Sequence, residues 1–263
     1  MASRADECGR EALIINSSAA TSTGKVREVN EDAVCVVCPE SSNEMLSRGV
    51  LALVADGMGG VNGGKCASSI AAAVISRLYA ESNERPPVAL GRAIEAANER
   101  IYAEGKADKA LSGMGTTCAV VALTPEQVWL AWVGDSRVYL IRNRQLFQMT
   151  EDHSFVASMV REGLLTSDQA TCHEERHVLT KVLGTRPEVE VAVWKESMPV
   201  RAGDRFLLCS DGLHDLLTED DLLEFGIGGP VAEAAAALVE RANELGGPDN
   251  ISAVLLEVGG AGC

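Results

Sequence analysis

The sequence predicts an α+β protein in which one β-sheet packs on another and helices cover the outside. Nine short segments rich in Val, Leu and Ile, bounded by Gly, Asp, Asn or Pro, have the composition of strands. Several follow one another without an intervening helix, which favours antiparallel pairing. Two central helical stretches fall between a strand pair and a longer run of strands, an arrangement typical of the α+β class.

The expected strands begin near the N-terminus and continue to the end of the chain. In chain order they cover residues 12–20, 32–37, 49–56, 116–124, 127–135, 137–143, 189–194, 204–212 and 251–258. The tetrapeptides TPEQ (124–127) and RNRQ (142–145) separate consecutive apolar runs and indicate hairpin turns.

Three stretches have helical periodicity. Residues 65–80 carry Ile70, Val74 and Leu78 at helical spacing, and residues 88–104 repeat Ile94 and Ile101. Residues 231–245 are rich in alanine and stop at a Gly-Gly pair, which terminates helices. The polar segment 151–186 has weaker strand character, and we expect it to form helices and loops that project from the core.

Composition limits the classes of partner. Of 263 residues, 38 are acidic and 23 are basic, so the formal net charge is −15. This balance argues against binding to nucleic acid or to an anionic membrane. The first residues, MASRADECGR, lack an apolar signal core, and no run approaches the roughly 20 apolar residues that span a bilayer. We expect a cytoplasmic, monomeric protein with one domain.

Acidic residues recur where the expected strands end or begin. A single aspartate at such a position is most often a turn former or a helix cap. Five such positions need a common explanation, because the ends of neighbouring strands converge in a sheet sandwich. The residues are Glu31 and Asp32 in VNEDA, Asp56 in LVADGMGG, Asp135 in LAWVGDSR, Asp211 in LLCSDGLHD, and Asp249 beside Asn250 in GGPDNIS.

Clustered carboxylates repel one another unless cations neutralise them. Oxygen ligands without flanking His or Cys favour Mg²⁺ or Mn²⁺ over Zn²⁺. The glycines after Asp56 and Asp211 let the backbone come close, so that a glycine carbonyl can complete a coordination shell. Two such ions could activate a water molecule for in-line attack. Arg27 lies four residues before Glu31 and is a candidate clamp for a substrate phosphate.

A nucleotide-binding loop is the alternative interpretation of DGMGGVNGGK. The stretch lacks the GxxxxGK[ST] spacing, and Lys65 is followed by Cys66 rather than by Ser or Thr. An aspartate at the head of such a loop would also repel phosphate unless a metal ion intervened.

Eight motifs occur in an order that resembles a known family. They are GKVREVNEDA, LVADGMGG, SGMGTT, VGDSRVYLIR, MTEDHS, LTKVLG, LCSDGLHDLL and GGPDNIS. Together they are similar to the successive motifs of the metal-dependent, type 2C serine/threonine protein phosphatases, and most similar to the bacterial branch. The resemblance implies a four-layer α-β-β-α sandwich of two antiparallel sheets flanked by helices, with a flap segment. It also implies hydrolysis of phosphoserine and phosphothreonine by a water between two Mg²⁺ or Mn²⁺ ions, without a phospho-enzyme.

The resemblance also assigns roles to residues of this chain. Asp56 would bridge the two metals, Gly57 would offer its carbonyl to one of them, and Arg27 would grip the phosphate. Asp211 and Asp249 would hold the first metal, and Glu31 and Asp32 the second, directly or through water. Asp135 with Asp211 would form a third, weaker metal site, and Asn250 would support the ligands.

One position departs from part of the family. Some members carry a histidine two residues after the bridging aspartate, thought to be the general acid, where this chain has Met58. A thioether cannot donate a proton, so the proton donor to the leaving group stays unassigned. We expect His153 to fix its loop rather than to act in catalysis. We expect the remaining histidines, His173, His177 and His214, to be solvated.

The motifs also suggest boundaries and rival functions. We expect an N-terminal extension over residues 1–21, a catalytic domain over 22–258 with its flap at about 154–185, and a tail over 259–263. A cognate kinase is an expected partner beside the phosphoprotein substrates. A catalytically silent regulatory module on the same fold is the main rival, but it predicts loss of metal-binding aspartates that are all present here. A phosphatase for small phosphate esters is a second rival.

Overall fold

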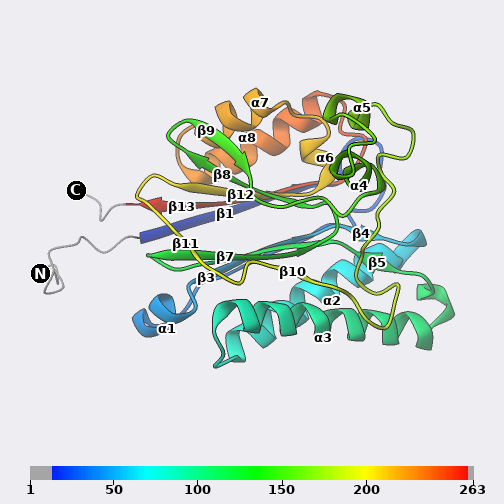
Figure 1. Cartoon of the computed structure of the whole chain (residues 1–263), viewed down its shortest axis with the longest axis horizontal. Coiled ribbons are helices and arrows are strands. Elements are labelled where there is room, and N and C mark those ends of the chain that lie inside the picture. Colours follow the sequence, from blue (N-terminus) through cyan, green and yellow to red (C-terminus); the bar gives the residue numbers. More distant parts are fainter. Residues whose placement is uncertain (1–13, 260–263) are drawn as a thin grey trace, which may run out of the picture.

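Two antiparallel sheets form the centre of the molecule, which we describe from a computed structural model covering residues 14–259 (Figure 1). The five-stranded sheet has the order β1 (Ile14–Ser22), β13 (Ile251–Gly259), β12 (Arg205–Cys209), β8 (Arg137–Arg142) and β9 (Gln145–Gln148). The six-stranded sheet has the order β10 (Ala192–Val193), β7 (Gln127–Val133), β6 (Cys118–Leu123), β3 (Val50–Ala55) and β2 (Ala33–Val37), with β11 (Met198–Pro199) also paired to β7.

Helices cover the outer face of each sheet, so the sandwich has four layers, as Figure 1 shows. α2 (Gly60–Glu81) and α3 (Pro86–Ala107) pack on the six-stranded sheet. α6 (Asp211–His214), α7 (Glu219–Gly226) and α8 (Val231–Glu244) pack on the five-stranded sheet. The predicted α-β-β-α sandwich is confirmed.

Strand β3 illustrates why its sequence is apolar throughout. Val50, Ala52 and Val54 face the core between the sheets. Leu51 and Leu53 point the other way, into the core beneath α2 and α3. Because successive side chains of a strand alternate between its two faces and both faces are covered, alternation with polar residues is absent.

The expected hairpins form at 124–127, between β6 and β7, and at 142–145, between β8 and β9. The sequence places α3 and α8 within three residues of their observed ends. α2 begins at Gly60, five residues before the expected start, because the glycine-rich stretch after Gly59 is already helical. The expected strand 189–194 is reduced to the two residues of β10. The short helices α1 (Ser42–Ser47), α6 and α7 are not foreseen.

The first strand corrects the domain boundary that the motifs indicated. β1 starts at Ile14 and pairs along its whole length with β13, from Ile14–Gly259 to Ser22–Ile251. Residues 14–21, expected to lie in an extension, therefore belong to the five-stranded sheet, as does Gly259. Residues 1–13 and 260–263 lie outside the described part of the chain.

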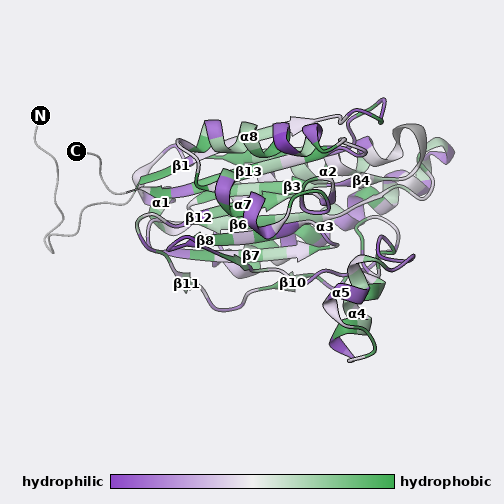
Figure 2. Cartoon of the chain, turned by 90° about the horizontal axis from the view of Figure 1, so that it is seen from above, coloured by the Kyte–Doolittle hydropathy of each residue, from purple (hydrophilic) through white to green (hydrophobic). Residues whose placement is uncertain are grey.

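The segment 154–185 forms α4 (Phe155–Arg161), α5 (Ser167–Thr171) and connecting loops. Figure 2 shows α4 and α5 projecting from the body of the sandwich. An isolated bridge from Leu183 to Thr116 ties the segment to the body, and a second one joins Leu179 to Ser154 within the segment. We keep the name flap for residues 154–185.

Candidate metal centre

The strand register brings the predicted acidic residues to one end of the sandwich. Ala33 pairs with Ala55, so the residues just before β2 lie beside the residue just after β3. Cys209 pairs with both Arg137 and Ala253 in the other sheet. The loops that adjoin these pairs carry Glu31, Asp32, Asp56, Asp135, Asp211 and Asp249. Residues from five separate parts of the sequence therefore converge at this end.

The backbone of Asp56 is fixed between β3 and a short ladder of β4 (Gly57–Met58) with β5 (Gly115–Thr116). Its carbonyl oxygen accepts hydrogen bonds from the Thr117 N–H at 2.9 Å and the Thr116 hydroxyl at 2.8 Å. Its own N–H donates to the Thr117 hydroxyl at 3.0 Å. With its backbone held in this way, the carboxylate has a defined position at the strand end.

Gly57 allows the helix α2 to come close to this loop. A Cβ atom on Gly57 would lie 2.2 Å from the carbonyl oxygen of Gly64 and 2.6 Å from that of Glu31. Such distances exclude any side chain without a shift of the backbone. The glycine is thus required by close packing between α2 and the acidic loop, as well as by access to its carbonyl.

Asp211 begins the short helix α6, and its surroundings join the two sheets. Ser210, just before it, donates its hydroxyl proton to the Asp32 carboxylate at 2.8 Å. A Cβ atom on Gly212 would lie 2.0 Å from the carbonyl oxygen of Asn250, so only glycine fits there. Asp211 is consequently held against both the loop before β2 and the loop before β13.

Asn250 holds the backbone of the loop between β1 and β2 by hydrogen bonds. The residue is 5% exposed. Its side-chain oxygen accepts the Glu31 N–H at 2.8 Å, and its amide group donates to the carbonyls of Thr23 and Val29, each at 3.0 Å. It therefore sets the backbone that carries both Arg27 and Glu31.

Arg27 lies over the centre and pairs with Asp249. The distance from Arg27 Nη2 to Asp249 Oδ2 is 2.7 Å, and the two side chains are 53% and 36% exposed. The other Asp249 oxygen accepts the Asn250 N–H at 2.8 Å. The hydrogen bond to Asp249 and the charge of Asp249 raise the pKa of Arg27, and the charges of Glu31 and Asp56 raise it further. The guanidinium is thus permanently charged and accessible to solvent.

The acidic residues destabilise one another's charged forms. Burial raises the pKa of Asp56 well above its ordinary value, and the charges of Asp211 and Asp32 raise it further. Burial also raises the pKa of Asp32 to about 6, against hydrogen bonds from Ser252 and Ser210 that lower it. The pKa of Asp135 is raised to about 7 by burial and by Asp211. A bound cation would stabilise the charged form of these buried carboxylates.

Three carboxylate oxygens point to where cations would bind. Glu31 Oε1, Asp32 Oδ1 and Asp211 Oδ1 are buried, and among the described residues they have no hydrogen-bond partner. Buried polar atoms are rarely left unpaired. A set made of carboxylates and backbone carbonyls suits Mg²⁺ or Mn²⁺. The donor set therefore fits hard divalent cations.

A flap histidine also reaches this end of the molecule. Among the described residues, His177, Asp211 and Asp215 have ligand atoms within 4.8 Å of one another. His177 is 53% exposed, and its Nδ1 lies 3.6 Å from Asp215 Oδ2. It is exposed, as expected, but it adjoins a predicted ligand.

His214 does not fit the expectation of solvation. Its side chain is 3% exposed. Its Nε2 lies 3.1 Å from the carbonyl oxygen of Asp135, and its Nδ1 lies 3.2 Å from Asp215 Oδ1. Because α6 packs against the β7–β8 loop, His214 fixes the backbone of Asp135 from within the protein.

His153 has the contacts of a structural residue. Its Nδ1 accepts the Gly134 N–H at 3.1 Å, and its ring stacks on Trp132 with centroids 6.2 Å apart. Burial, with a contribution from the charge of Lys181, lowers its pKa to about 4. It is therefore neutral at pH 7. Met58 is 41% exposed and offers no proton to a leaving group.

Several residues that hold the acids were not identified from the sequence. Thr117 and Ser210 are described above, and the hydroxyl of Ser68 on α2 donates to the Glu31 carbonyl at 2.5 Å. Ser68, Thr117 and Ser210 are all buried. The available signal is a small hydroxyl residue beside a motif aspartate or glycine, as in CSDG and GTT, but this signal is weak because such residues are also common in turns.

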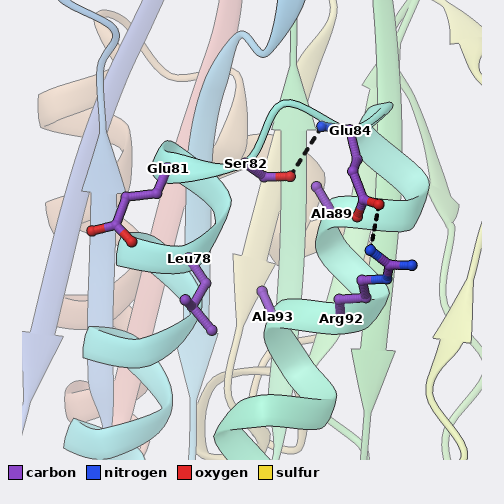
Figure 3. A pocket seen from close by; sticks show the side chains of 7 residues that line it. All are labelled: Leu78, Glu81, Ser82, Glu84, Ala89, Arg92 and Ala93. Atoms are coloured by element: carbon purple, nitrogen blue, oxygen red, sulfur yellow. Dashed lines mark hydrogen bonds and ion pairs between the residues drawn. The ribbon is translucent and has the colours of Figure 1, made fainter.

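Two cavities lie away from the predicted metal-binding residues. One, of about 340 Å³, lies at the turn between α2 and α3, where Arg92 pairs with Glu84 across its wall (Figure 3). The other, of about 410 Å³, lies between the β8–β9 turn and the loop before β12. Neither contains a predicted site residue.

Comparisons with known proteins agree with the motifs. A family model described as Protein phosphatase 2C matches residues 22–254. The serine/threonine protein phosphatase PstP of Mycobacterium tuberculosis is 36% identical over 250 residues, which cover 95% of this chain and 46% of the relative. The chain thus spans about half the length of that relative. The serine/threonine phosphatase stp of Listeria monocytogenes is 35% identical over 245 residues, covering 90% of this chain and 93% of the relative.

A solved structure is also similar. The crystal structure of the catalytic domain of PstP in complex with two manganese ions superposes with a TM-score of 0.79. It is 34% identical, and the match covers 94% of this chain and 99% of that chain.

Proposed function

The chain belongs to the protein phosphatase 2C family, and from this membership we propose that it hydrolyses phosphoserine and phosphothreonine in proteins with two bound Mg²⁺ or Mn²⁺ ions. The observation that carries the proposal is the convergence of strand-end carboxylates beneath Arg27, with three buried oxygens that lack partners within the described part of the chain. A relative in this family binds two manganese ions. The acids and the arginine together suit a dianionic phosphate held over cations.

The ligand assignment follows the motifs. Asp56 would contact both ions, and the Gly57 carbonyl would contact one of them. Asp211 and Asp249 would hold the first ion. Glu31 and Asp32 would hold the second, directly or through water. When bound, two such ions lower the pKa of a water molecule and neutralise phosphate oxygens.

The chain's own residues would position the substrate. Arg27, exposed and charged, would bind two phosphate oxygens with its planar fork and orient the phosphorus for in-line attack. Asn250 would hold the Arg27 loop, and Thr117 would hold the Asp56 loop, at fixed distances from the phosphate. No side chain in this scheme forms a covalent bond with phosphorus.

A third, weaker cation would be bound by Asp135 and Asp211. His214 supports this role for Asp135, because it fixes the Asp135 carbonyl. His177 and Asp215 lie on the Asp211 side of the same region. The flap would therefore border this third site.

The setting we propose is bacterial signal transduction, in which the enzyme reverses a serine/threonine kinase in the cytoplasm and acts as a monomer. The similarity to bacterial phosphatases supports this proposal. Within residues 14–259, none of the helices has the length and apolar character of a bilayer-crossing segment. The strongly acidic composition supports the absence of nucleic acid among its partners.

Hydrolysis of an aryl phosphate by purified protein tests this function. We expect turnover with Mn²⁺ or Mg²⁺, loss of turnover with EDTA, recovery on adding metal back, and resistance to inhibitors of other phosphatase classes. A phosphoserine peptide should be a substrate under the same conditions. Absence of turnover with both metals would favour the silent regulatory module, and metal-independent turnover would refute the mechanism.

A further inference from the structure

We propose that the cavity between the β8–β9 turn and the loop before β12 is a second phosphate-binding site, which takes a phosphorylated residue of a protein substrate. We call it the distal arginine pocket. It is lined by Arg142, Arg144, Arg201 and Arg205, with Asp204 at its base. This inference rests on the proposed function, hydrolysis of phosphoproteins, and extends that function to substrates with more than one phosphorylated residue.

The pocket lies at the end of the five-stranded sheet opposite the metal centre. Strand β12 runs from Arg205 in the pocket to Cys209, two residues before Asp211. Asp211 lies six residue steps along the chain from Arg205, which corresponds to about 20 Å in an extended strand. A single substrate chain can therefore reach both places.

Two of the four arginines form the walls. Arg142 makes a two-pronged ion pair with Asp204, with N–O distances of 2.7 and 2.6 Å, and Asp204 is 1% exposed. Arg205 pairs with Glu257 at 2.7 Å and donates to the carbonyls of Gly226 and Gly229. These two guanidinium groups already have protein partners, which they hold together at this end of the sheet.

The other two arginines carry charge that the pocket does not neutralise. Arg144 and Arg201 are exposed, and in the part of the chain that the structure describes their guanidinium groups take part in no ion pair. The backbone of Arg201 is nevertheless fixed, because its N–H donates to the Asp204 carboxylate at 2.7 Å. Four guanidinium groups thus face two carboxylates, in a protein whose net charge is −15.

The backbone of the β8–β9 turn is strained at Arg144. Asn143 and Arg144 have φ angles of 53° and 59°, and within residues 14–259 they are the non-glycine residues with positive φ. Hairpin turns of this kind favour Asn followed by Gly, because a side chain is strained in the left-handed region. Arginine in the glycine position therefore adds strain to the turn. Strain of this kind is often retained at functional sites.

The chemistry of the pocket selects its ligand. Two free planar forks on a cavity of about 410 Å³ match the several oxygens of a phosphate group better than they match one carboxylate. A phosphomonoester carries close to two negative charges at pH 7. This matches the two positive charges of Arg144 and Arg201, which no carboxylate of the pocket pairs with. A phosphoserine or phosphothreonine about six residues from the scissile one spans the required distance in an extended peptide.

A kinetic experiment with Mn²⁺ tests the proposal directly. The substrates are peptides with one phosphoserine, with or without a second group six residues away on either side. The second group is the phosphonate analogue of phosphoserine, whose C–P bond resists hydrolysis, or a glutamate. We expect the phosphonate, in one of the two placements, to lower KM about tenfold with kcat unchanged, and glutamate to have little effect.

Paired variants locate the effect. Arg144→Ala/Arg201→Ala should lose the tenfold preference while keeping aryl phosphate turnover. Arg77→Ala/Arg92→Ala removes the same charge from exposed arginines on α2 and α3 and should keep the preference. The proposal is overturned if the wild-type protein has the same KM for all peptides. It is also overturned if both double variants lose the preference equally, or if glutamate lowers KM as much as the phosphonate does.

Binding without turnover separates this inference from the proposed function. A labelled peptide carrying only the phosphonate should bind the full chain in EDTA, and anisotropy should show at least about tenfold weaker binding to Arg144→Ala/Arg201→Ala. If this binding occurs but aryl phosphate is not hydrolysed, the pocket stands and the phosphatase proposal fails. If inorganic phosphate binds to the same arginines but the peptide does not, the ligand is free phosphate and the inference is wrong.

Discussion

The Arg27 guanidinium lies 2.7 Å from a carboxylate oxygen of Asp249, so the residue proposed to bind the substrate phosphate is paired with a residue proposed to bind metal. These side chains are 222 residues apart in the sequence. The loop of Arg27 is joined to the Asp249 loop through Asn250, which bonds to the carbonyls of Thr23 and Val29. Phosphate binding and metal binding therefore depend on the same piece of structure.

Arg27→Ala should weaken substrate binding and leave the metals in place. Loss of a charged hydrogen-bond donor to phosphate corresponds to about 1.5–3 kcal/mol, or about 10- to 100-fold in kcat/KM for an aryl phosphate. Calorimetric titration should still give two Mn²⁺ per chain. Arg27→Lys, which keeps the charge but not the fork, should recover part of the loss. Unchanged kinetics in Arg27→Ala would remove this residue as the phosphate clamp.

The metal-free protein should become less stable as the pH rises from about 5.5 to 8. The pKa values of Asp32 and Asp135 are about 6 and 7 in the folded protein, above the ordinary aspartate value of 3.8. A raised pKa means that the protonated form favours folding, and this contribution is lost as the pH passes through the folded pKa. Thermal unfolding in EDTA measures the trend.

Mn²⁺ should reverse this trend, because cations stabilise the charged carboxylates and protons compete with them for the same oxygens. The melting temperature with Mn²⁺ should rise over the same pH range. A metal-free melting temperature that stays flat or rises between pH 5.5 and 8 would contradict the proposed burial of these acids.

Much of the fold could be predicted from the sequence, because its core strands are continuous apolar runs. Strands such as β3 (Val50–Ala55) and β6 (Cys118–Leu123) are buried along their whole length, and all their residues are apolar. The start of α2 could not be predicted, since glycines at 60, 63 and 64 disfavour helix. Gly64 is required there by its close packing against the backbone of Gly57. α7 is eight residues long, too short for its periodicity to stand out.

Asn250→Ala should lower both stability and Mn²⁺ affinity. The side chain makes three hydrogen bonds, so its loss should cost about 3 kcal/mol in the free energy of unfolding. Because it positions Glu31, Mn²⁺ affinity should fall about 10- to 100-fold.

Asn98→Ala is the matched control for Asn250. Asn98 is 1% exposed and also makes three hydrogen bonds, to the backbone of Gly184, Arg186 and Pro187. Its replacement should destabilise the fold by a similar amount without changing Mn²⁺ affinity. Equal effects of both variants on Mn²⁺ binding would mean that Asn250 acts through global stability alone.

His153→Ala should affect stability more than catalysis. Loss of the bond to the Gly134 N–H leaves a buried donor unpaired, which costs about 1–3 kcal/mol. The value of kcat at a temperature where the variant is folded should stay within about threefold, with an unchanged pH profile. Loss of one limb of the pH–rate profile in a folded variant would instead assign His153 a role in proton transfer.

The candidate site could be predicted in its acidic residues but not in its supports. The aspartates occur at strand ends in a repeated local pattern, and the strand register then brings them together. His214 illustrates the remainder. Its burial depends on how α6 packs against the β7–β8 loop, and neighbouring residues in the sequence carry no signal of that contact.

The most direct test of the account is aryl phosphate turnover by Asp56→Asn, measured with a parallel Mn²⁺ titration. Asp56 is proposed to contact both ions, so we expect loss of Mn²⁺ binding and a fall in kcat/KM of about 10³-fold or more. Asp220→Asn, at an exposed position on α7, should match the wild-type protein in both measurements. Full activity in Asp56→Asn, or turnover that persists in EDTA, would contradict the account.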